Sequence, residues 1–176
     1  YYRRSVELYG LRDEVKPFIR GYFNTIPSLL SLENLSFWEH FHNAGGWNKT
    51  HETGWFLCQT RMMLVQERGD ELWLAPFLTR DWLKDGAVIR VQNAPTNFGK
   101  TGYVIQSAVG RRSIEAVIDP PAASPPNWIV LRLRHPEEKP IRRVTVNGEP
   151  HEGFDASAET IRLKPGPSRL VVRVEY

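Results

Sequence analysis

The chain has 176 residues, a length that suits one domain or one and a half domains. Because 41% of the residues are hydrophobic, the chain can form a hydrophobic core. Its net charge is only +3, and the basic and acidic residues are interspersed, so solvated strand faces are expected rather than a nucleic-acid surface. A single cysteine excludes an intrachain disulfide, and no apolar stretch approaches the roughly 18 residues of a membrane span, so no membrane partner is expected.

Residues 1–69 are predicted to be a helical segment. The chain begins within helical sequence, without an initiator methionine, so we expect it to be a piece of a longer protein with an N-terminal remainder. From Val15 to Leu30, apolar residues recur at the i, i+3, i+4, i+7 spacing of an amphipathic helix. Asp13 is the expected N-cap, and Pro27 predicts a kink or an early end.

A second helix is predicted from Thr50 to Arg68, with Gly69 as its C-terminal stop. Before it, residues 36–42 could form a short helix or a structured loop, and the Gly-Gly pair at 45–46 breaks any regular element. Apolar side chains cover most of the circumference of the second helix, which is typical of a buried helix. Two helices and a β module cannot surround it, which again indicates a missing N-terminal part.

After residue 70 the apolar period changes from that of a helix to two, the period of a strand. Residues 70–86 are expected to be a linker, and residues 87–176 a β-sandwich domain whose antiparallel strands alternate apolar and polar residues. The pair Asn147-Gly148 predicts a hairpin turn. Helices followed by strands predict an α+β fold. Extended segments are predicted over 71–77, 87–93, 100–109, 112–119, 127–135, 140–147, 159–164 and 168–176.

The turn before the second helix brings together Trp47, Asn48, His51 and Glu52. Apolar rings beside a carboxylate, an imidazole and an amide suit a sugar-binding or sugar-cleaving pocket. The pair His51-Glu52 suggests a His-Glu-x-x-His zinc motif, but Trp55 occupies the place of the second histidine and excludes that site. Glu52 is therefore a candidate acid or nucleophile. The alternative is that it only complements the helix N-terminus.

A second aromatic and polar group precedes this turn and comprises Trp38, Glu39, His40 and His42. The functional interpretation is a sugar subsite, with an aromatic platform and polar groups that bind hydroxyls. The alternative is a packed aromatic loop, because aromatic side chains usually serve core burial. A metal site lacks a clear third ligand, so neither a metal nor a cofactor is expected.

Three stretches of the chain resemble the C-terminal end of a six-hairpin, (α/α)6-toroid glycosidase. They are Thr-His-Glu-Thr-Gly-Trp-Phe at 50–56, Gly-Asp-Glu-Leu-Trp-Leu-Ala-Pro-Phe at 69–77 and Val-Thr-Val-Asn-Gly-Glu-Pro at 144–150. The resemblance implies the last helices of an α/α toroid followed by an antiparallel β-sandwich. It also implies that the loop before the last long helix faces a sugar-binding funnel.

The resemblance implies a segment of a glycoside hydrolase that acts on oligo- or polysaccharide by carboxylate acid/base chemistry. Glu52 and His51 are then the expected catalytic residues. The expected substrate-binding residues are Trp47, Asn48, Trp38, Glu39, His40, His42 and Trp55. In related families the acid often comes from an earlier helix, so we do not expect these 176 residues to be active alone.

The expected partners are a carbohydrate substrate and the N-terminal remainder of the same protein. By analogy with glycosidases, the expected location is periplasmic or secreted. Two alternatives stay open at this point: a non-catalytic β-sandwich module for stability or carbohydrate binding, and a segment of a polysaccharide lyase.

Overall fold

The computed structural model describes residues 4–41 and 43–176 of this α+β chain. The chain divides into two compact units between Met63 and Leu64, and each unit is described by itself below. Within the described residues, no helix combines the length and the apolar character needed to cross a membrane.

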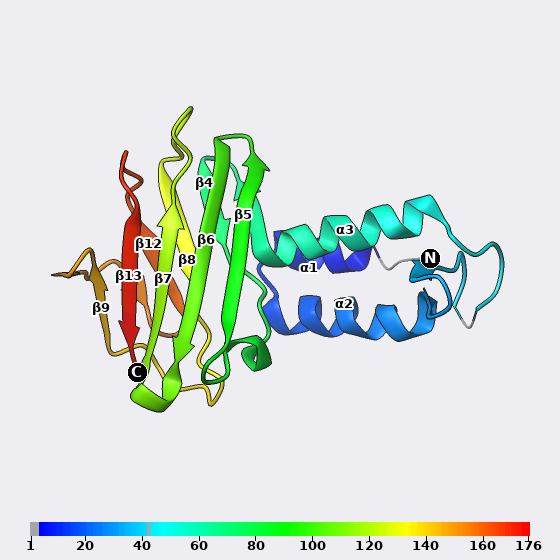
Figure 1. The fold of residues 1–176 in the computed structure, drawn as a ribbon, viewed down its shortest axis with the longest axis horizontal. Coiled ribbons are helices and arrows are strands. Elements are labelled where there is room, and N and C mark those ends of the chain that lie inside the picture. The colour runs from blue at the N-terminus through cyan, green and yellow to red at the C-terminus, as the bar shows by residue number, and fades with distance from the viewer. Residues whose placement is uncertain (1–3, 42) are drawn as a thin grey trace. The chain divides into compact units, whose positions relative to one another are not determined.

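The first unit contains helices and one short strand pair (Figure 1). Its elements are α1 (Ser5–Leu11), α2 (Val15–Leu29), β1 (Leu30–Ser31), β2 (Ser36–Phe37) and α3 (Thr50–Leu64), whose last residue belongs to the second unit. The chain from 36 to 42 was expected to be a short helix or a structured loop, and its described part consists of β2 and a loop. The strands β1 and β2 pair antiparallel, which ties the end of α2 to the start of this loop.

Helix α2 confirms the predicted amphipathic helix, because Phe18, Tyr22 and Leu29 are buried on one face. The expected N-cap is wrong. Asp13 has a left-handed backbone with φ 60°, and Glu14, the residue before the helix, makes no side-chain cap. The aromatic rings of Phe18 and Tyr22 and of Tyr22 and Phe56 stack, so ring packing fixes this helix where capping does not.

Helix α3 ends four residues before the predicted position. The residues Val65–Arg68 form strand β3, which pairs antiparallel with β4 (Glu71–Leu74). Gly69, with φ 60°, lies in the turn between these strands instead of ending a helix. A left-handed glycine suits both a helix stop and a two-residue hairpin turn, so its presence could not tell the two apart.

Helix α3, whose apolar residues were expected to exceed what this chain can surround, is only partly buried among the described residues. Helix α3 buries only Glu52, Gln59 and Met63 among its described residues, and Leu57 is 60% exposed. Apolar residues are spread around the whole circumference of α3, so one packed face cannot bury them all.

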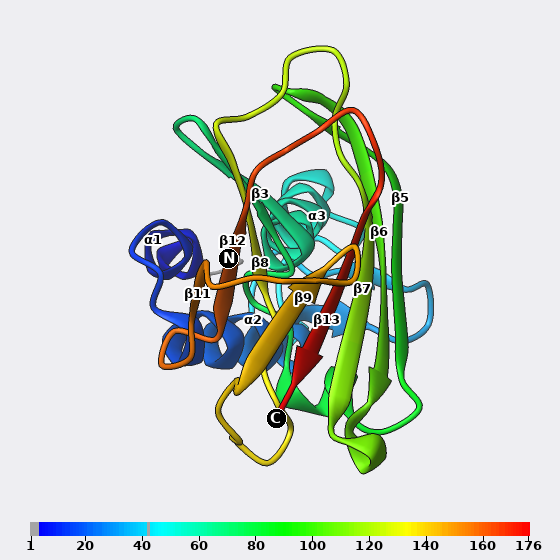
Figure 2. The same cartoon turned by 90° about the vertical axis from the view of Figure 1, so that its left-hand side faces the viewer.

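The second unit consists of two β-sheets and two short 3-10 helices. The six-stranded sheet has the order β10-β9-β13-β7-β6-β5, and the five-stranded sheet has the order β11-β12-β8-β4-β3 (Figure 2). The remaining elements are η1 (Arg80–Leu83), β5 (Val88–Thr96), β6 (Gly99–Ala108), η2 (Val109–Arg111), β7 (Ser113–Asp119), β8 (Trp128–Arg132), β9 (Arg143–Val146), β10 (Glu149–Pro150), β11 (Phe154–Asp155), β12 (Thr160–Leu163) and β13 (Leu170–Glu175).

One pair of strands corrects the expectation of a fully antiparallel sandwich, because β4 and β8 pair in parallel, with Leu72 opposite Ile129. The long connection between them includes β5, β6 and β7 of the other sheet. A parallel pair needs such a long crossover, whereas a hairpin can join only antiparallel neighbours. The segment 70–86, expected as a linker, thus contains β4 and η1.

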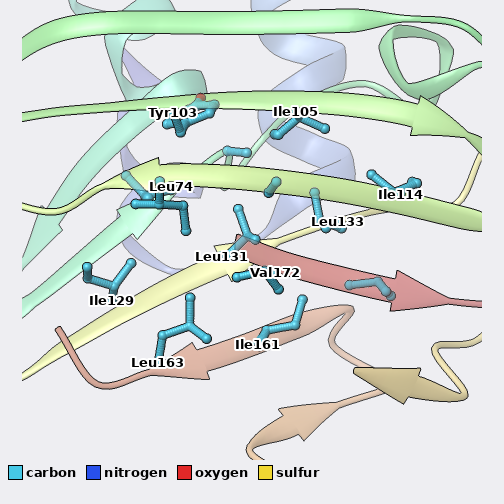
Figure 3. Close-up of a cluster of buried hydrophobic side chains, with 14 of the residues drawn as sticks. Leu74, Tyr103, Ile105, Ile114, Ile129, Leu131, Leu133, Ile161, Leu163 and Val172 are labelled. Atoms are coloured by element: carbon cyan, nitrogen blue, oxygen red, sulfur yellow. The ribbon is translucent and has the colours of Figure 1, made fainter. Parts of the chain in front are cut away.

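The core of this unit lies between its two sheets. Ile105, Ile114 and Val172 come from the six-stranded sheet, and Leu131 and Ile161 from the five-stranded one, and all five are fully buried (Figure 3). Strand β13 has the burial pattern of alternating buried and exposed residues that was expected for a sandwich strand.

The predicted hairpin turn is confirmed by the pairing of β9 with β10. Asn147 has φ 52° and Gly148 has φ 90°, as a type I′ turn requires. The Asn147 side chain also accepts a hydrogen bond from the Val171 N–H at 2.8 Å, which links the turn to the start of β13.

Candidate functional site

The loop between β2 and α3 carries most of the predicted site residues, and backbone hydrogen bonds fold it. The N–H of Glu39 donates to the Gly46 carbonyl at 2.9 Å, and the N–H of Lys49 donates to the Phe37 carbonyl at 3.0 Å. Gly45 has φ 80°, and a Cβ built on it would lie 2.9 Å from the ring of His40, so this turn requires glycine.

The carboxylate of Glu39 is fixed inside this loop by two partners. Its Oε2 accepts a hydrogen bond from the Gly46 N–H at 3.3 Å, and its Oε1 lies 3.2 Å from Lys49 Nζ. The hydrogen bond from Gly46 and the interaction with Lys49 lower the pKa of Glu39. At neutral pH Glu39 is therefore an ionised, partly accessible hydrogen-bond acceptor.

His51 and Glu52 form the second close pair of ionisable side chains, at the start of α3. His51 Nε2 lies 2.8 Å from Glu52 Oε1, and the side chain of His51 is 49% exposed, whereas that of Glu52 is completely buried. A buried carboxylate is costly unless it is paired and hydrogen-bonded, and the contact with His51 offsets only part of that cost, because it lacks hydrogen-bond geometry at Glu52 Oε1. The pair can thus present His51 at the surface in an orientation that Glu52 holds.

The aromatic candidates differ in how accessible they are. The Trp47 side chain is 60% exposed, whereas Trp38 and Trp55 are half-buried. Trp55 packs against the small apolar cluster of Leu29 and Phe37 and carries the Arg4 guanidinium 4.4 Å from its ring centroid. Trp47 is therefore the ring most available to a ligand.

The other polar candidates occupy the surface of the same loop. Asn48 is exposed and has a left-handed backbone with φ 61°, and His40 is exposed as well. His42 lies outside the described residues. Lys49 lies in the same polar turn but was not among the predicted site residues. In the sequence, only its position beside Asn48 indicates that Lys49 belongs to the site, because its partner Glu39 is ten positions away.

The structure forms two close pairs of ionisable side chains: Glu39 with Lys49, which was not a predicted site residue, and His51 with Glu52. A groove of about 580 Å³ in this unit is lined by α1, α2 and Phe41, and none of the predicted site residues that the structure describes lines it. Among the residues that the structure describes, no group of three or more His, Cys, Asp or Glu side chains could hold a metal ion.

A second cluster of ionisable groups lies in the β unit, where Glu159 joins two arginines. Arg80 Nη1 lies 2.7 Å from Glu159 Oε1, and Arg134 Nε lies 3.2 Å from Glu159 Oε2. Arg134 also donates from Nη1 to the Leu78 carbonyl at 3.2 Å. Each of these bonds ties one part of the sandwich to another, so the cluster serves the fold.

The fold and the loop together define an α+β chain with a helical unit, a two-sheet unit and a surface loop rich in aromatic and charged residues. No family model matches the chain, and no curated protein matches it. One similar solved structure bears the name "Glycoside hydrolase", with a TM-score of 0.47 and 13% sequence identity over 98% of this chain. The chain spans 30% of the length of that structure, and a likeness this low assigns neither family nor activity.

Proposed function

We propose that this chain is part of a carbohydrate-active enzyme, specifically a glycoside hydrolase whose helices α1–α3 end an α/α toroid. The observation that carries the proposal is the loop from 38 to 52. It combines an exposed ring, Trp47, with an ionised carboxylate, Glu39, and with the pair of His51 and Glu52. The resemblance of 50–56, 69–77 and 144–150 to toroid glycosidases supports the same class.

The expected chemistry is general acid/base catalysis at a glycosidic bond. Such a reaction needs one group to protonate the leaving oxygen and a second to act as nucleophile or to activate water. Glu52 is completely buried, so its burial favours a positioning role exerted through His51, whose exposed ring can reach a substrate. In this proposal the remaining catalytic carboxyl group belongs to another part of the enzyme.

The proposed sugar contacts come from the surface of the loop. The exposed ring of Trp47 offers an apolar face to a sugar ring, and Asn48 and His40 offer groups that hydrogen-bond hydroxyls. Glu39 accepts hydrogen bonds from hydroxyl groups, because Gly46 and Lys49 hold its carboxylate in place and charged. Trp38, His42 and Trp55 remain proposed members of the same sugar site.

A specific observation favours a second candidate, a non-catalytic module. Glu52 is buried, and the loop satisfies much of its backbone with internal hydrogen bonds. A loop with only a structural role would show both features. In that case the β-sandwich would provide stability or carbohydrate binding, and the side chains of the loop would only pack against the rest of the protein.

Rate measurements on the complete protein with a panel of oligosaccharides distinguish the two candidates. We expect His51→Ala to lower kcat by roughly 10²–10⁴, the range for loss of a general acid or base. Glu52→Gln should lower kcat with little change in KM, because His51 loses the contact that orients it. Trp47→Ala should mainly raise KM, and Trp82→Ala, in η1, is the matched control for loss of an exposed ring.

Wild-type rates in both His51→Ala and Glu52→Gln would contradict the site assignment. The non-catalytic candidate instead predicts no turnover on any oligosaccharide. In that case the variants would change only the midpoint of thermal unfolding, which is recorded for every variant.

A further inference from the structure

A groove on the first unit lies along helices α1 and α2, apart from the pair of His51 and Glu52. Its volume of about 580 Å³ lies within the range of roughly 300–1,000 Å³ that is usual for small-molecule sites. Its walls combine two rings, those of Tyr9 and Phe41, with a row of polar side chains on α2.

The polar row follows one face of α2 at intervals of four residues: Lys16, Arg20, Asn24 and Ser28 all line the groove. Residues four apart on a helix are neighbours on the same face. The opposite face of α2 is buried through residues such as Phe18 and Tyr22, so packing holds the row in position.

The charge of the groove is positive and uncompensated. Lys16 and Arg20 line it, and none of the lining residues that the structure describes is acidic. Within the described chain, neither cation forms an ion pair, and Glu14, the acid that precedes α2, pairs with Arg12 at 2.8 Å. Two like charges four residues apart disfavour each other, and a bound anion would relieve that repulsion.

We infer that this groove binds a saccharide that carries carboxylate groups, such as an oligouronide. Arg20 offers a planar donor fork that matches a carboxylate, and Lys16 offers a second positive charge. The amide of Asn24 and the hydroxyl of Tyr9 can both donate and accept, as sugar hydroxyls require. The Ser28 hydroxyl donates to the Asn24 carbonyl at 3.3 Å and so offers an acceptor. The inference rests on the proposed function, because the saccharide class of the ligand is taken from that proposal.

Titration calorimetry on the complete protein tests the inference with an oligogalacturonide and a neutral gluco-oligosaccharide of equal length. In the double variant Lys16→Gln/Arg20→Gln, the Kd for the oligogalacturonide should rise about tenfold or more, because two charge-assisted contacts are lost. The control Arg12→Gln/Lys84→Gln removes the same two charge types outside the groove and should change that Kd less than about twofold. Higher ionic strength should weaken binding in the wild type.

Three results would overturn the inference. They are equal affinity for the neutral and the acidic sugar, an oligogalacturonide Kd that the groove variant leaves unchanged, and equally tight binding of a poly-glutamate peptide. If neutral oligosaccharides are cleaved while any of these results holds, the groove assignment fails and the proposed function stands. If no saccharide is bound or cleaved, both fail.

Discussion

His135 shows at the scale of a single residue how burial sets chemistry in the β unit. Its side chain is 1% exposed, Nδ1 accepts a hydrogen bond from the Glu137 N–H at 3.1 Å, and its ring lies 4.7 Å from that of Tyr176. Desolvation, reinforced by Lys139, lowers the pKa of His135 in the folded protein. The neutral imidazole is therefore the form that the fold accepts.

The lowered pKa of His135 predicts a loss of stability in mild acid. Below about pH 6.5 the histidine of the unfolded chain binds a proton that the folded chain resists, so the free energy of unfolding falls as pH falls. Above that pH both states are neutral and this contribution is level. Urea unfolding at pH 5 to 8 should show a shallower acid slope for His135→Asn, whose side chain can still accept the Glu137 N–H.

Equal acid slopes in the wild type and His135→Asn would contradict this prediction. Comparing the two proteins removes the effect of carboxylates that titrate in both. The value measured at pH 8 reports the packing cost of the substitution alone.

Glu39 and Lys49 show what a single residue cannot reveal. Each is an ordinary charged residue in the sequence, and ten positions separate them. The turn at Gly45 and the backbone bond from Glu39 to Gly46 bring the charges within 3.2 Å. The ion pair of Glu39 and Lys49 therefore depends on the conformation of the whole loop, which no short sequence pattern predicts.

Strand β13 illustrates the scale of the element, because two neighbouring valines face opposite sides of the sheet. Val172 is completely buried in the core between the sheets, whereas Val171 is 37% exposed. Each Val→Ala substitution removes the same atoms. We expect Val172→Ala to lower the free energy of unfolding by about 2 kcal/mol, from lost burial and the cavity left behind.

Val171→Ala is the matched control and should cost less than about 1 kcal/mol, mainly through weaker strand propensity. Urea denaturation of both variants gives the two values. Equal losses would mean that the alternation of β13 does not separate core from solvent.

At the scale of the whole molecule, the chain is two compact units, and the second holds a large core of its own. Leu64 marks its start, and the Leu64 carbonyl accepts hydrogen bonds from Ala75 N–H at 2.8 Å and from the Tyr103 hydroxyl at 2.9 Å. We expect residues 64–176, produced alone, to unfold in one cooperative transition, because both sheets and their shared core are retained.

Differential scanning calorimetry measures this transition directly. Residues 1–63 produced alone provide the comparison and should show no sharp transition, because their exposed apolar residues include Leu8 and Leu57. A gradual, non-cooperative transition for 64–176 would contradict the prediction.

The sequence by itself determined the features that depend on neighbouring residues. The apolar spacing of α2, the turn at Asn147-Gly148 and the alternation in β13 all follow from the local geometry of a helix, a turn or a strand. They follow because period and turn chemistry are properties of a few consecutive residues.

Only the tertiary structure decided where α3 gives way to β3, that β4 and β8 pair in parallel, and that Glu52 is buried while His51 is exposed. Each of these three features depends on strand pairing or on side-chain burial. The free energies of pairing and burial exceed the small intrinsic helix and strand propensities of the residues involved. Helical propensity can thus give way to a hairpin pairing, and a charged residue predicted for a surface site can be buried beside its imidazole partner.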